Sequence, residues 1–380
     1  MKPLHSERAS LSANYAVRDH QLPGRVVLVL QGGGALGAYQ VGVYEALHDA
    51  GIEPEWIIGT SIGAINGALI AGNELGNRIE RLLAFWDQVE QRSFAAGAWD
   101  ALGMGNAWST IATVLGGIPS FFRPNPLAFH GNRAAVGIEQ AAYYSTAPLR
   151  RTLAELVDFG QINEKRGTRL TVGAVNVNSG VMTYFDSRTT RMEADHVMAS
   201  GALPPAFGAV RIGGEPYWDG GIYSNTPIEA VLDDNPRRDS LIFAVNVWHQ
   251  TGDEPQSIQQ VLVRQKDIQF ASRADSHIAR QKQIHRLRHV IRELSKELPR
   301  AKLTQAHVKE LAAWGCGTTV HVAHLVAPRV EGEDHSKDID FSTRGIGARR
   351  QAGYADTLRM IERSPWQAQC DPIEGVIEHR

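Results

Sequence analysis

The chain has 380 residues, of which 43% are hydrophobic and 21% are charged, and its formal net charge is −2. A chain of this length buries a large core, and its near-neutral charge argues against a nucleic-acid binder driven by bulk charge. Its two cysteines, Cys316 and Cys370, are too few for a disulfide framework, so a reducing cytoplasm is the expected compartment.

Residues 1–24 carry charges throughout and have no apolar core of the secretory type, which predicts a flexible leader. The next segment, Arg25 to Leu30 (RVVLVL), is typical of a strand buried on both faces of a parallel sheet. After a glycine-rich loop, apolar residues recur at helical spacing from Val41 to Leu47. We expect this helix to end at Gly51, because glycine commonly terminates helices.

A second sharp turn, GTSIG, lies between the apolar run Trp56 to Ile58 and a segment with helical periodicity. A serine on a turn from strand to helix projects its hydroxyl clear of both elements. The flanking glycines, Gly59 and Gly63, permit close backbone approaches that a Cβ atom would obstruct. Ser61 is therefore the candidate nucleophile. With the first strand, this segment predicts one right-handed βαβ unit with two special turns.

The glycine-rich loop matches GxGxxG at Gly32, Gly34 and Gly37, so a dinucleotide-binding oxidoreductase is a rival hypothesis. In that fold an acid that binds the ribose stands at the carboxyl end of the second strand. Here Glu53 and Glu55 precede the strand, and the serine turn occupies its end. The position of the acids therefore disfavours the rival.

The alternative use of the loop is an oxyanion hole. Successive glycines, Gly32, Gly33, Gly34 and Gly37, let backbone N–H groups converge beside the positive end of the following helix. We expect the amides of Gly33 and Gly34 to be the donors. Since the loop and the serine turn end neighbouring parallel strands, they are expected to face each other across one crevice.

A third glycine-rich turn, Asp219-Gly220-Gly221, precedes a loop and a predicted helix start near Pro227. Many Asp-Gly-Gly tripeptides are ordinary turns, but this chain has three glycine-rich turns that each follow a predicted strand. Asp219 is therefore the candidate base for Ser61, and Gly220 and Gly221 belong to its motif.

A Ser-Asp-His triad stays open, because the chain has fourteen histidines and some follow Asp219, as His249 and His277 do. None of them lies in a tight motif. No short histidine or cysteine spacing indicates a metal site, and we predict neither a metal nor a cofactor.

The three turns together resemble the signature of the patatin-like phospholipases, as GGGALG, GTSIG and DGG. The segments TVGAVNVNSGVMTYFD and ASGALPPAF fit as well, so the resemblance covers Arg25 to Trp248. It implies a three-layer α/β/α acyl hydrolase fold with a mainly parallel central sheet and a Ser-Asp dyad. By that implication Ser61 attacks an ester carbonyl, Asp219 takes its proton, and the glycine loop holds the oxyanion before water deacylates the enzyme.

One residue departs from that family pattern. Many members carry Lys or Arg at the fifth position of the glycine loop, where this chain has Leu36. The backbone donors are unaffected, but a positive charge beside the hole is missing, so the resemblance does not imply a preference for anionic head groups.

The stretch Ala101 to Phe122 has no charged residue and is rich in aromatic and aliphatic side chains. It has the length of a transmembrane span, but its glycines and Pro119 interrupt hydropathy and helix. We interpret it as a mobile lid or acyl-chain wall over the active site, with a buried helical insertion as the alternative.

After Trp248 the pattern becomes mainly helical. An apolar seam at helical spacing calls for a partner helix and consists of Ile284, Leu287, Ile291, Leu294 and Leu298. The region Arg264 to Lys302 has eleven Lys or Arg against four Asp or Glu. It is a solvated helix face, a surface attracted to anionic phospholipid head groups, or a homodimer contact through the C-terminal helices.

A returning strand is predicted at Thr318 to Val326 and a closing helix within residues 340–362. This extension resembles that of a bacterial subgroup of patatin-like proteins whose C-terminal region has no assigned function. The sequence leaves open whether it extends the same sheet or caps it.

The sequence thus predicts a leader over residues 1–24, a catalytic domain over 25–250 and a helical extension over 251–380 packed on it. The predicted function is a serine acyl hydrolase of lipid esters, cytoplasmic or peripheral to a membrane, with no nucleic-acid partner. The dinucleotide-binding oxidoreductase and a non-catalytic lipid-binding protein remain the alternatives.

Overall fold

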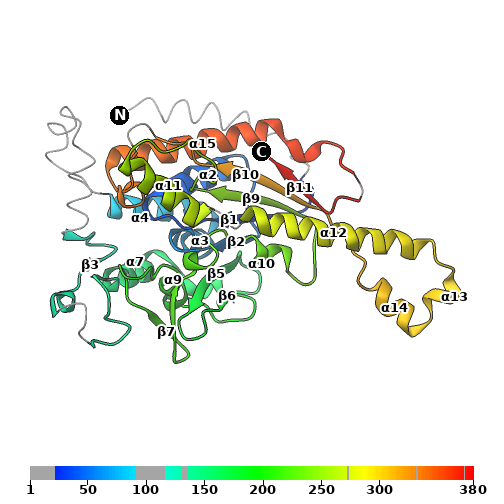
Figure 1. Ribbon diagram of the computed structural model, residues 1–380, viewed down its shortest axis with the longest axis horizontal. Coiled ribbons are helices and arrows are strands. Elements are labelled where there is room, and N and C mark those ends of the chain that lie inside the picture. The colour runs from blue at the N-terminus through cyan, green and yellow to red at the C-terminus, as the bar shows by residue number, and fades with distance from the viewer. Residues whose placement is uncertain (1–21, 91–115, 131–134, 272–273, 331–332, 372) are drawn as a thin grey trace.

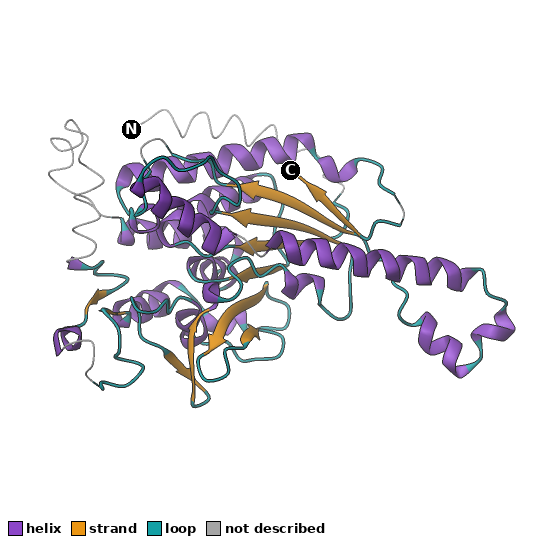
Figure 2. Ribbon diagram, in the orientation of Figure 1, coloured by secondary structure: helices purple, strands orange, loops and turns teal. Residues whose placement is uncertain are grey.

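The computed structural model describes residues 22–90, 116–130, 135–271, 274–330, 333–371 and 373–380. Most of the predicted leader lies outside these ranges, and so does most of the uncharged stretch, including Trp108. In the described residues a nine-stranded mixed sheet has helices on both faces (Figures 1 and 2). The expected three-layer α/β/α fold with a mainly parallel sheet is confirmed.

The strands of the large sheet are β1 (Arg25–Leu30), β2 (Trp56–Gly59), β5 (Arg169–Asn176), β6 (Met182–Asp186), β7 (Val210–Ile212), β8 (Glu215–Asp219), β9 (Ser240–Asn246), β10 (Val320–Val326) and β11 (Val376–His379). They follow the spatial order β11, β10, β9, β1, β2, β5, β8, β7, and β6 also pairs with β5. All pairings from β11 to β5 are parallel, and the remaining pairings are antiparallel. A separate small sheet joins β3 (Arg123–Pro124) to β4 (Tyr144–Ser145).

The α-helices in the described ranges are α2 (Ala38–Asp49), α3 (Ile62–Ala71), α4 (Arg78–Val89), α7 (Ala147–Leu156), α8 (Phe159–Ile162), α9 (Ala194–Ser200), α10 (Glu229–Leu232), α11 (Ile258–Ala271), α12 (Ala274–Lys296), α13 (Arg300–Leu303), α14 (Ala306–Ala312) and α15 (Thr343–Arg363). Short 3₁₀ turns include η1 (Gly34–Gly37), η4 (Gly220–Ile222) and η5 (Lys337–Ile339). No helix in the described ranges is long and apolar enough to cross a membrane.

All six residues of β1 are buried, because alternate side chains enter two different cores. Val26, Leu28 and Leu30 pack in the core on the side of α2, α3, α4 and α15. Val27 and Val29 pack in the core on the side of α10 and α12. The predicted burial of both faces of this strand is confirmed.

The first two special turns begin at the same edge of the sheet. Leu30 and Gly59, the last residues of β1 and β2, are partners in the parallel register. The helix expected after the glycine loop is α2, and Gly51 follows it with a φ of 72°. Asp219, the last residue of β8, lies opposite Ala174 of β5. The sheet thus gathers the three predicted motifs.

The region after residue 250 supplies strands as well as helices. The predicted strand and closing helix are confirmed as β10 and α15, and β10 pairs with β9 while β11 pairs with β10. Helix α15 lies along α2, where Arg350 forms an ion pair with Glu45. A Cβ atom on Gly42 would lie 1.8 Å from the carbonyl oxygen of Arg350, so glycine lets the two helices touch. The extension therefore continues the same sheet.

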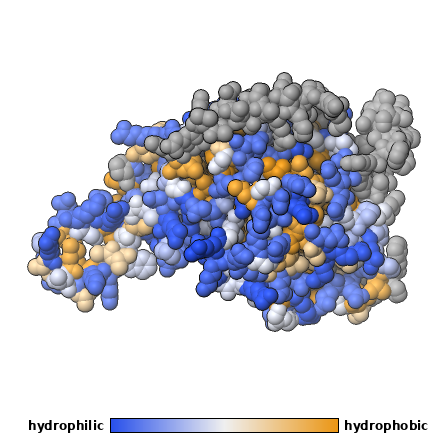
Figure 3. All heavy atoms as spheres, turned by 180° about the vertical axis from the view of Figure 1, so that it is seen from behind, coloured by the Kyte–Doolittle hydropathy of each residue, from blue (hydrophilic) through white to orange (hydrophobic). Residues whose placement is uncertain are grey.

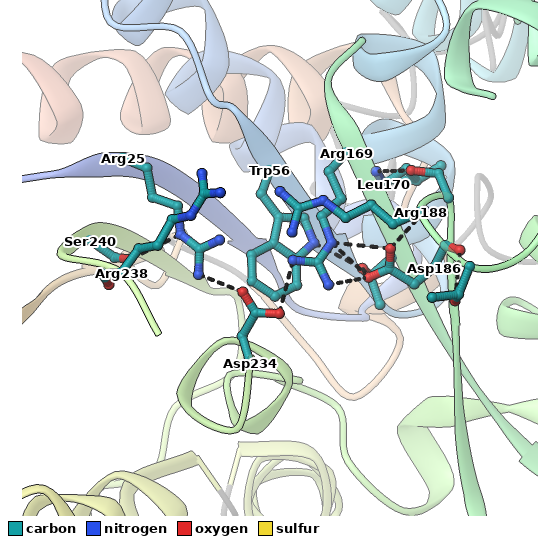
Figure 4. Close-up of polar contacts among 12 residues, drawn as sticks. Arg25, Trp56, Arg169, Leu170, Asp186, Arg188, Asp234, Arg238 and Ser240 are labelled. Carbon is teal, nitrogen blue, oxygen red and sulfur yellow. Dashed lines mark hydrogen bonds and ion pairs between the residues drawn. The ribbon is translucent and has the colours of Figure 1, made fainter. Parts of the chain in front are cut away.

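An ion-pair network ties together the strand ends farthest from the three motifs (Figure 4). The ring of Trp56 lies between the guanidinium groups of Arg25 and Arg169, whose Cζ atoms are 4.8 Å and 3.6 Å from its centroid. Asp234 accepts from Arg25 at 2.8 Å and from Arg169 at 3.0 Å. Because these side chains are largely buried, the network fixes the starts of β1, β2 and β5 relative to one another.

Helix α12 runs beyond the body of the molecule and, with α13 and α14, forms a projection (Figure 1). We call residues 285–315 the arm. It lies toward the amino ends of the strands, at the other end of the molecule from α11 (Figure 1).

Candidate active site

Ser61 occupies a strained turn between β2 and α3. Its φ is 56° and its ψ is −126°, and in the described residues only one other residue besides glycine, Ser364, has a positive φ. Such angles are costly for an L-residue and recur at functional turns. Close packing surrounds the turn: a Cβ atom on Gly63 would lie 2.3 Å from the carbonyl oxygen of Leu30. The glycine at the end of the GTSIG motif thus allows the serine turn to pack directly against β1.

Asp219 is buried beside Ser61, with a side chain in an almost fully enclosed position. Its carboxylate accepts a hydrogen bond from the amide of Gly221 at 2.7 Å. Burial raises the pKa of Asp219 to about 7, although this hydrogen bond and the interaction with the Ser61 side chain lower it. A carboxylate with a pKa near neutrality is suited to accept and return a proton at physiological pH.

The amides of Gly33 and Gly34 are free in the described residues, since neither donates a hydrogen bond there. Gly34 has a φ of 55°, and a Cβ atom on it would lie 2.2 Å from the carbonyl oxygen of Asp338. Both the conformation and the space therefore require glycine at this position.

Gly32 and Gly37, which the sequence also assigned to the oxyanion loop, have other roles in the structure. The amide of Gly32 donates to the carbonyl oxygen of Asn225 at 3.1 Å. A Cβ atom on Gly37 would lie 2.6 Å from Cγ1 of Ile62, so this glycine lets the loop pack against α3. The geometry therefore leaves Gly33 and Gly34 as the available donors.

Two side chains that the sequence did not single out hold the loop from outside. The carbonyl oxygen of Gly32 accepts from Nδ2 of Asn225 at 2.9 Å and from Nε1 of Trp248 at 2.7 Å. In a trans peptide the following N–H points opposite to the carbonyl, so these bonds turn the Gly33 N–H away from both side chains. Nothing local in the sequence marks this role, because Trp248 is distant in the chain.

Ser61, Asp219 and the first three loop glycines line a mainly apolar cavity of about 310 Å³. Gly201, Asn225 and Asp338 also line it, and aromatic and aliphatic side chains form most of the rest of its wall, namely Ile62, Ile65, Phe121, Phe122, Tyr144, Leu203, Ala206, Phe207, Trp248, Phe270, Ile339 and Phe341. Phe121 and Phe122 come from the described end of the uncharged stretch, and they are buried rather than exposed. Four further lining residues come from the region after residue 250, namely Phe270, Asp338, Ile339 and Phe341, so that region completes the cavity.

The histidines and glutamates weighed from the sequence lie elsewhere. Among the side chains that the structure describes, no histidine lines this cavity. His277 lies 3.6 Å from Glu229 instead. Glu53, before β2, forms ion pairs with His48 and Arg78. These contacts support neither a triad histidine nor a ribose-binding acid.

Comparison with known families gives two matches. The model of the family described as Patatin-like phospholipase matches residues 28–232, which is more than half of the chain. A second model, described as Patatin phospholipase, matches residues 268–373.

Among curated proteins, lysophospholipase nte1 of Aspergillus terreus is 51% identical over 69 residues, which are 18% of this chain and 4% of that protein. Patatin-like phospholipase domain-containing protein 6 of Homo sapiens is 37% identical over 82 residues, 21% of this chain and 6% of that protein. The chain therefore matches only a small part of each relative's length.

Two solved structures also match. VipD from Legionella pneumophila has a TM-score of 0.37 and 14% identity, covering 90% of this chain and 67% of that one. The ExoU–SpcU complex of the Pseudomonas aeruginosa type III secretion system has a TM-score of 0.27 and 18% identity, covering 77% and 59%.

Proposed function

The chain belongs to the patatin-like phospholipase family, and we propose that it is a serine acyl hydrolase that cleaves carboxylic esters of lipids. The observation that carries this proposal is the mainly apolar cavity that Ser61 and the buried carboxylate of Asp219 line together, beside the two free amides of Gly33 and Gly34. Apolar walls of this kind suit an acyl chain, and Ser61, Asp219 and the loop amides supply polar groups for an ester carbonyl.

In the proposed reaction the Ser61 hydroxyl attacks the ester carbonyl and passes its proton to Asp219. The amides of Gly33 and Gly34 donate to the oxyanion of the tetrahedral intermediate. As the intermediate collapses, Asp219 returns the proton to the leaving alcohol and an acyl-serine remains. Water then attacks this ester and gives a proton to Asp219. Asp219 returns that proton to the Ser61 oxygen as the carboxylic acid leaves, which restores both side chains.

Leu36 bears on the substrate class. It is buried at the position where many family members have a basic residue, so the loop offers no positive charge to an anionic head group. We therefore propose that the acyl chain, rather than the head group, dominates recognition in the cavity.

A panel of p-nitrophenyl esters of increasing chain length tests the function, with Ser61→Ala as the paired variant. We expect turnover by the parent protein and none above background by the variant, which removes one hydroxyl from a turn and should fold normally. A fluorophosphonate probe should label the parent at Ser61. If a folded Ser61→Ala variant turns over esters, the nucleophile assignment is wrong. If the parent binds lipid without any turnover, it is a non-catalytic lipid-binding protein.

We also propose that the arm contacts a second copy of the chain. Several of its apolar side chains are strongly exposed, namely Leu287, Leu294, Leu311 and Trp314. Figure 3 shows apolar side chains among hydrophilic ones on this projection. The arm has seven Lys or Arg against three Asp or Glu, whereas the whole chain is net acidic, so another copy offers surface of opposite charge.

Sedimentation velocity tests this contact. We expect a dimer that becomes a monomer when Leu294 and Trp314 are replaced by Gln. A monomer at all concentrations, with arm-dependent binding to anionic vesicles that fades with salt, would favour the lipid alternative.

A further inference from the structure

Helix α11 departs from the usual pattern of a surface helix, because four of its apolar residues face solvent. Ile258, Val261, Leu262 and Ile268 are 82%, 49%, 40% and 51% exposed. Residues three, four, seven and ten apart on a helix share one side, so these four form a single surface. We call them the outer face of α11. The other exposed residues of the helix are glutamines, and none is charged.

The three charged residues of α11 are bound on its inner side. Arg264 donates to the carbonyl oxygens of His249 and Gln250, at 3.1 Å and 2.6 Å. Lys266 pairs with Asp338 at 2.7 Å. Asp267, fully buried, pairs with Lys337 at 2.7 Å. These contacts fix the rotation of the helix about its axis, and this rotation directs the outer face toward solvent.

The outer face stands beside the candidate active site. Phe270, on the same helix, lines the cavity with Ser61, and its carbonyl oxygen accepts from Asn225 at 3.2 Å. Ile222 and Tyr223, just after Asp219, are also exposed. Figure 1 shows α11 beyond the carboxyl ends of β9 and β10, at the opposite end of the molecule from the arm. The helix that carries the outer face therefore borders the cavity through Phe270.

We propose that the outer face of α11 docks the enzyme on a lipid surface, with the cavity directed toward that surface. The proposal rests on the proposed function, since a lipid ester in an aggregate must pass from the aggregate into the cavity. Two observations favour a lipid surface as the partner of this face. The face has no charge with which to recognise an acidic or basic partner, and its helix borders an apolar cavity that suits acyl chains.

Because the face is uncharged, it predicts how vesicle binding depends on lipid charge and on salt. Apolar burial drives it, so binding does not require anionic lipid and does not fade with salt. This distinguishes the face from the basic arm, whose attraction to a membrane would depend on both.

The experiment compares two variants with matched chemistry in flotation with phosphatidylcholine vesicles. Ile258→Gln with Ile268→Gln changes the outer face, and Leu75→Gln with Ile373→Gln changes exposed apolar residues of other elements. Glutamine keeps helix propensity and charge. We expect the first variant to lose vesicle binding and hydrolysis of vesicle phosphatidylcholine by about tenfold or more, while hydrolysis of soluble p-nitrophenyl butyrate and the melting temperature stay unchanged. The second variant should match the parent in all four measurements.

Several results would overturn the proposal: no vesicle binding by the parent, unchanged binding by the Ile258/Ile268 variant, or binding that requires anionic lipid. A parent dimer that this variant converts to monomer would assign the face to a second copy, and a large fall in melting temperature would assign it to another segment of the chain. Val261→Gln with Leu262→Gln repeats the test at independent positions. Absence of any ester turnover would overturn the proposed function instead. The vesicle-binding measurements would still test the docking proposal, because they do not depend on turnover.

Discussion

As the proposed base, Asp219 faces two opposing requirements, because a proton acceptor must be ionised and burial disfavours the ionised form of a carboxylate. Burial raises its pKa to about 7. We therefore expect kcat/KM for a soluble ester to rise with pH and level off above about 7. A pH–rate profile measures this, and Asp219→Asn should lose on the order of 10³-fold or more at every pH. A profile that is flat from pH 5 to 9 would contradict the role of Asp219 as base.

The same burial predicts how stability depends on pH. Between the ordinary pKa of 3.8 and the folded-state value of about 7, the folded protein binds more protons than the unfolded chain. The contribution of Asp219 to stability is therefore complete below pH 3.8 and is lost as the pH rises through about 7. Relative to the parent, Asp219→Asn should gain melting temperature on going from pH 5 to pH 8. An unchanged difference would mean that the carboxylate is not desolvated.

We expect Trp248 to act on the proposed reaction through the glycine loop, because its Nε1 donates to the carbonyl oxygen of Gly32. Removing its N–H with Trp248→Phe leaves the Gly32 carbonyl oxygen with Asn225 as its remaining side-chain donor. We expect kcat to fall by about 10-fold to 100-fold with little change in KM, because the Gly33 amide matters most once the oxyanion forms. Ile339→Leu, on the cavity wall, is the control for simple repacking. A rise in KM at constant kcat would assign Trp248 to the wall alone.

At the scale of elements, the ion pairs of Asp234 hold the starts of β1 and β5 together, at a distance from the candidate active site. Asp234 bridges Arg25 and Arg169, so Asp234→Asn removes the carboxylate paired with the largely buried Arg25 and leaves Arg169 paired with Asp186. We expect a loss of about 3 kcal/mol in the free energy of unfolding, with kcat for a soluble ester unchanged.

Urea denaturation measures that loss, and Asp195→Asn is its control. Asp195 pairs with Arg150 at the surface, where such pairs contribute about 0–1 kcal/mol. Equal small effects of the two substitutions would show that the buried network does not stabilise the starts of β1, β2 and β5.

At the scale of the whole molecule, the boundary predicted near residue 250 marks a change of sequence pattern. We propose that it does not separate independent folding units. Ending the chain there removes β10, β11 and α15, which exposes the edge of β9 and one side of α2, and it removes Phe270, Ile339 and Phe341 from the cavity. Exposed sheet edges and apolar surface favour aggregation.

We therefore expect residues 1–250 alone to be insoluble or to melt without a cooperative transition. Solubility and thermal denaturation followed by circular dichroism check this. Cooperative unfolding together with ester turnover by the shortened chain would establish 25–250 as a self-sufficient catalytic domain.

The sequence by itself determined the features that depend on short stretches of chain. A strand buried on both faces at Arg25 to Leu30, a turn that must bear a serine between glycines, and glycines that admit a positive φ at Gly34 all leave local patterns. These patterns predicted the central sheet, the order of the motifs and their shared edge.

Tertiary structure alone decided which groups meet. Trp248 bonds to Gly32 across 216 positions of the chain, and Phe341 reaches the same cavity as Ser61. It also decided that Gly32 gives its amide to Asn225, that Gly37 packs on Ile62, and that the apolar side of α11 faces outward. The physical reason is that periodicity fixes which side chains share a face, whereas the partner of that face depends on packing between segments that are distant in the chain.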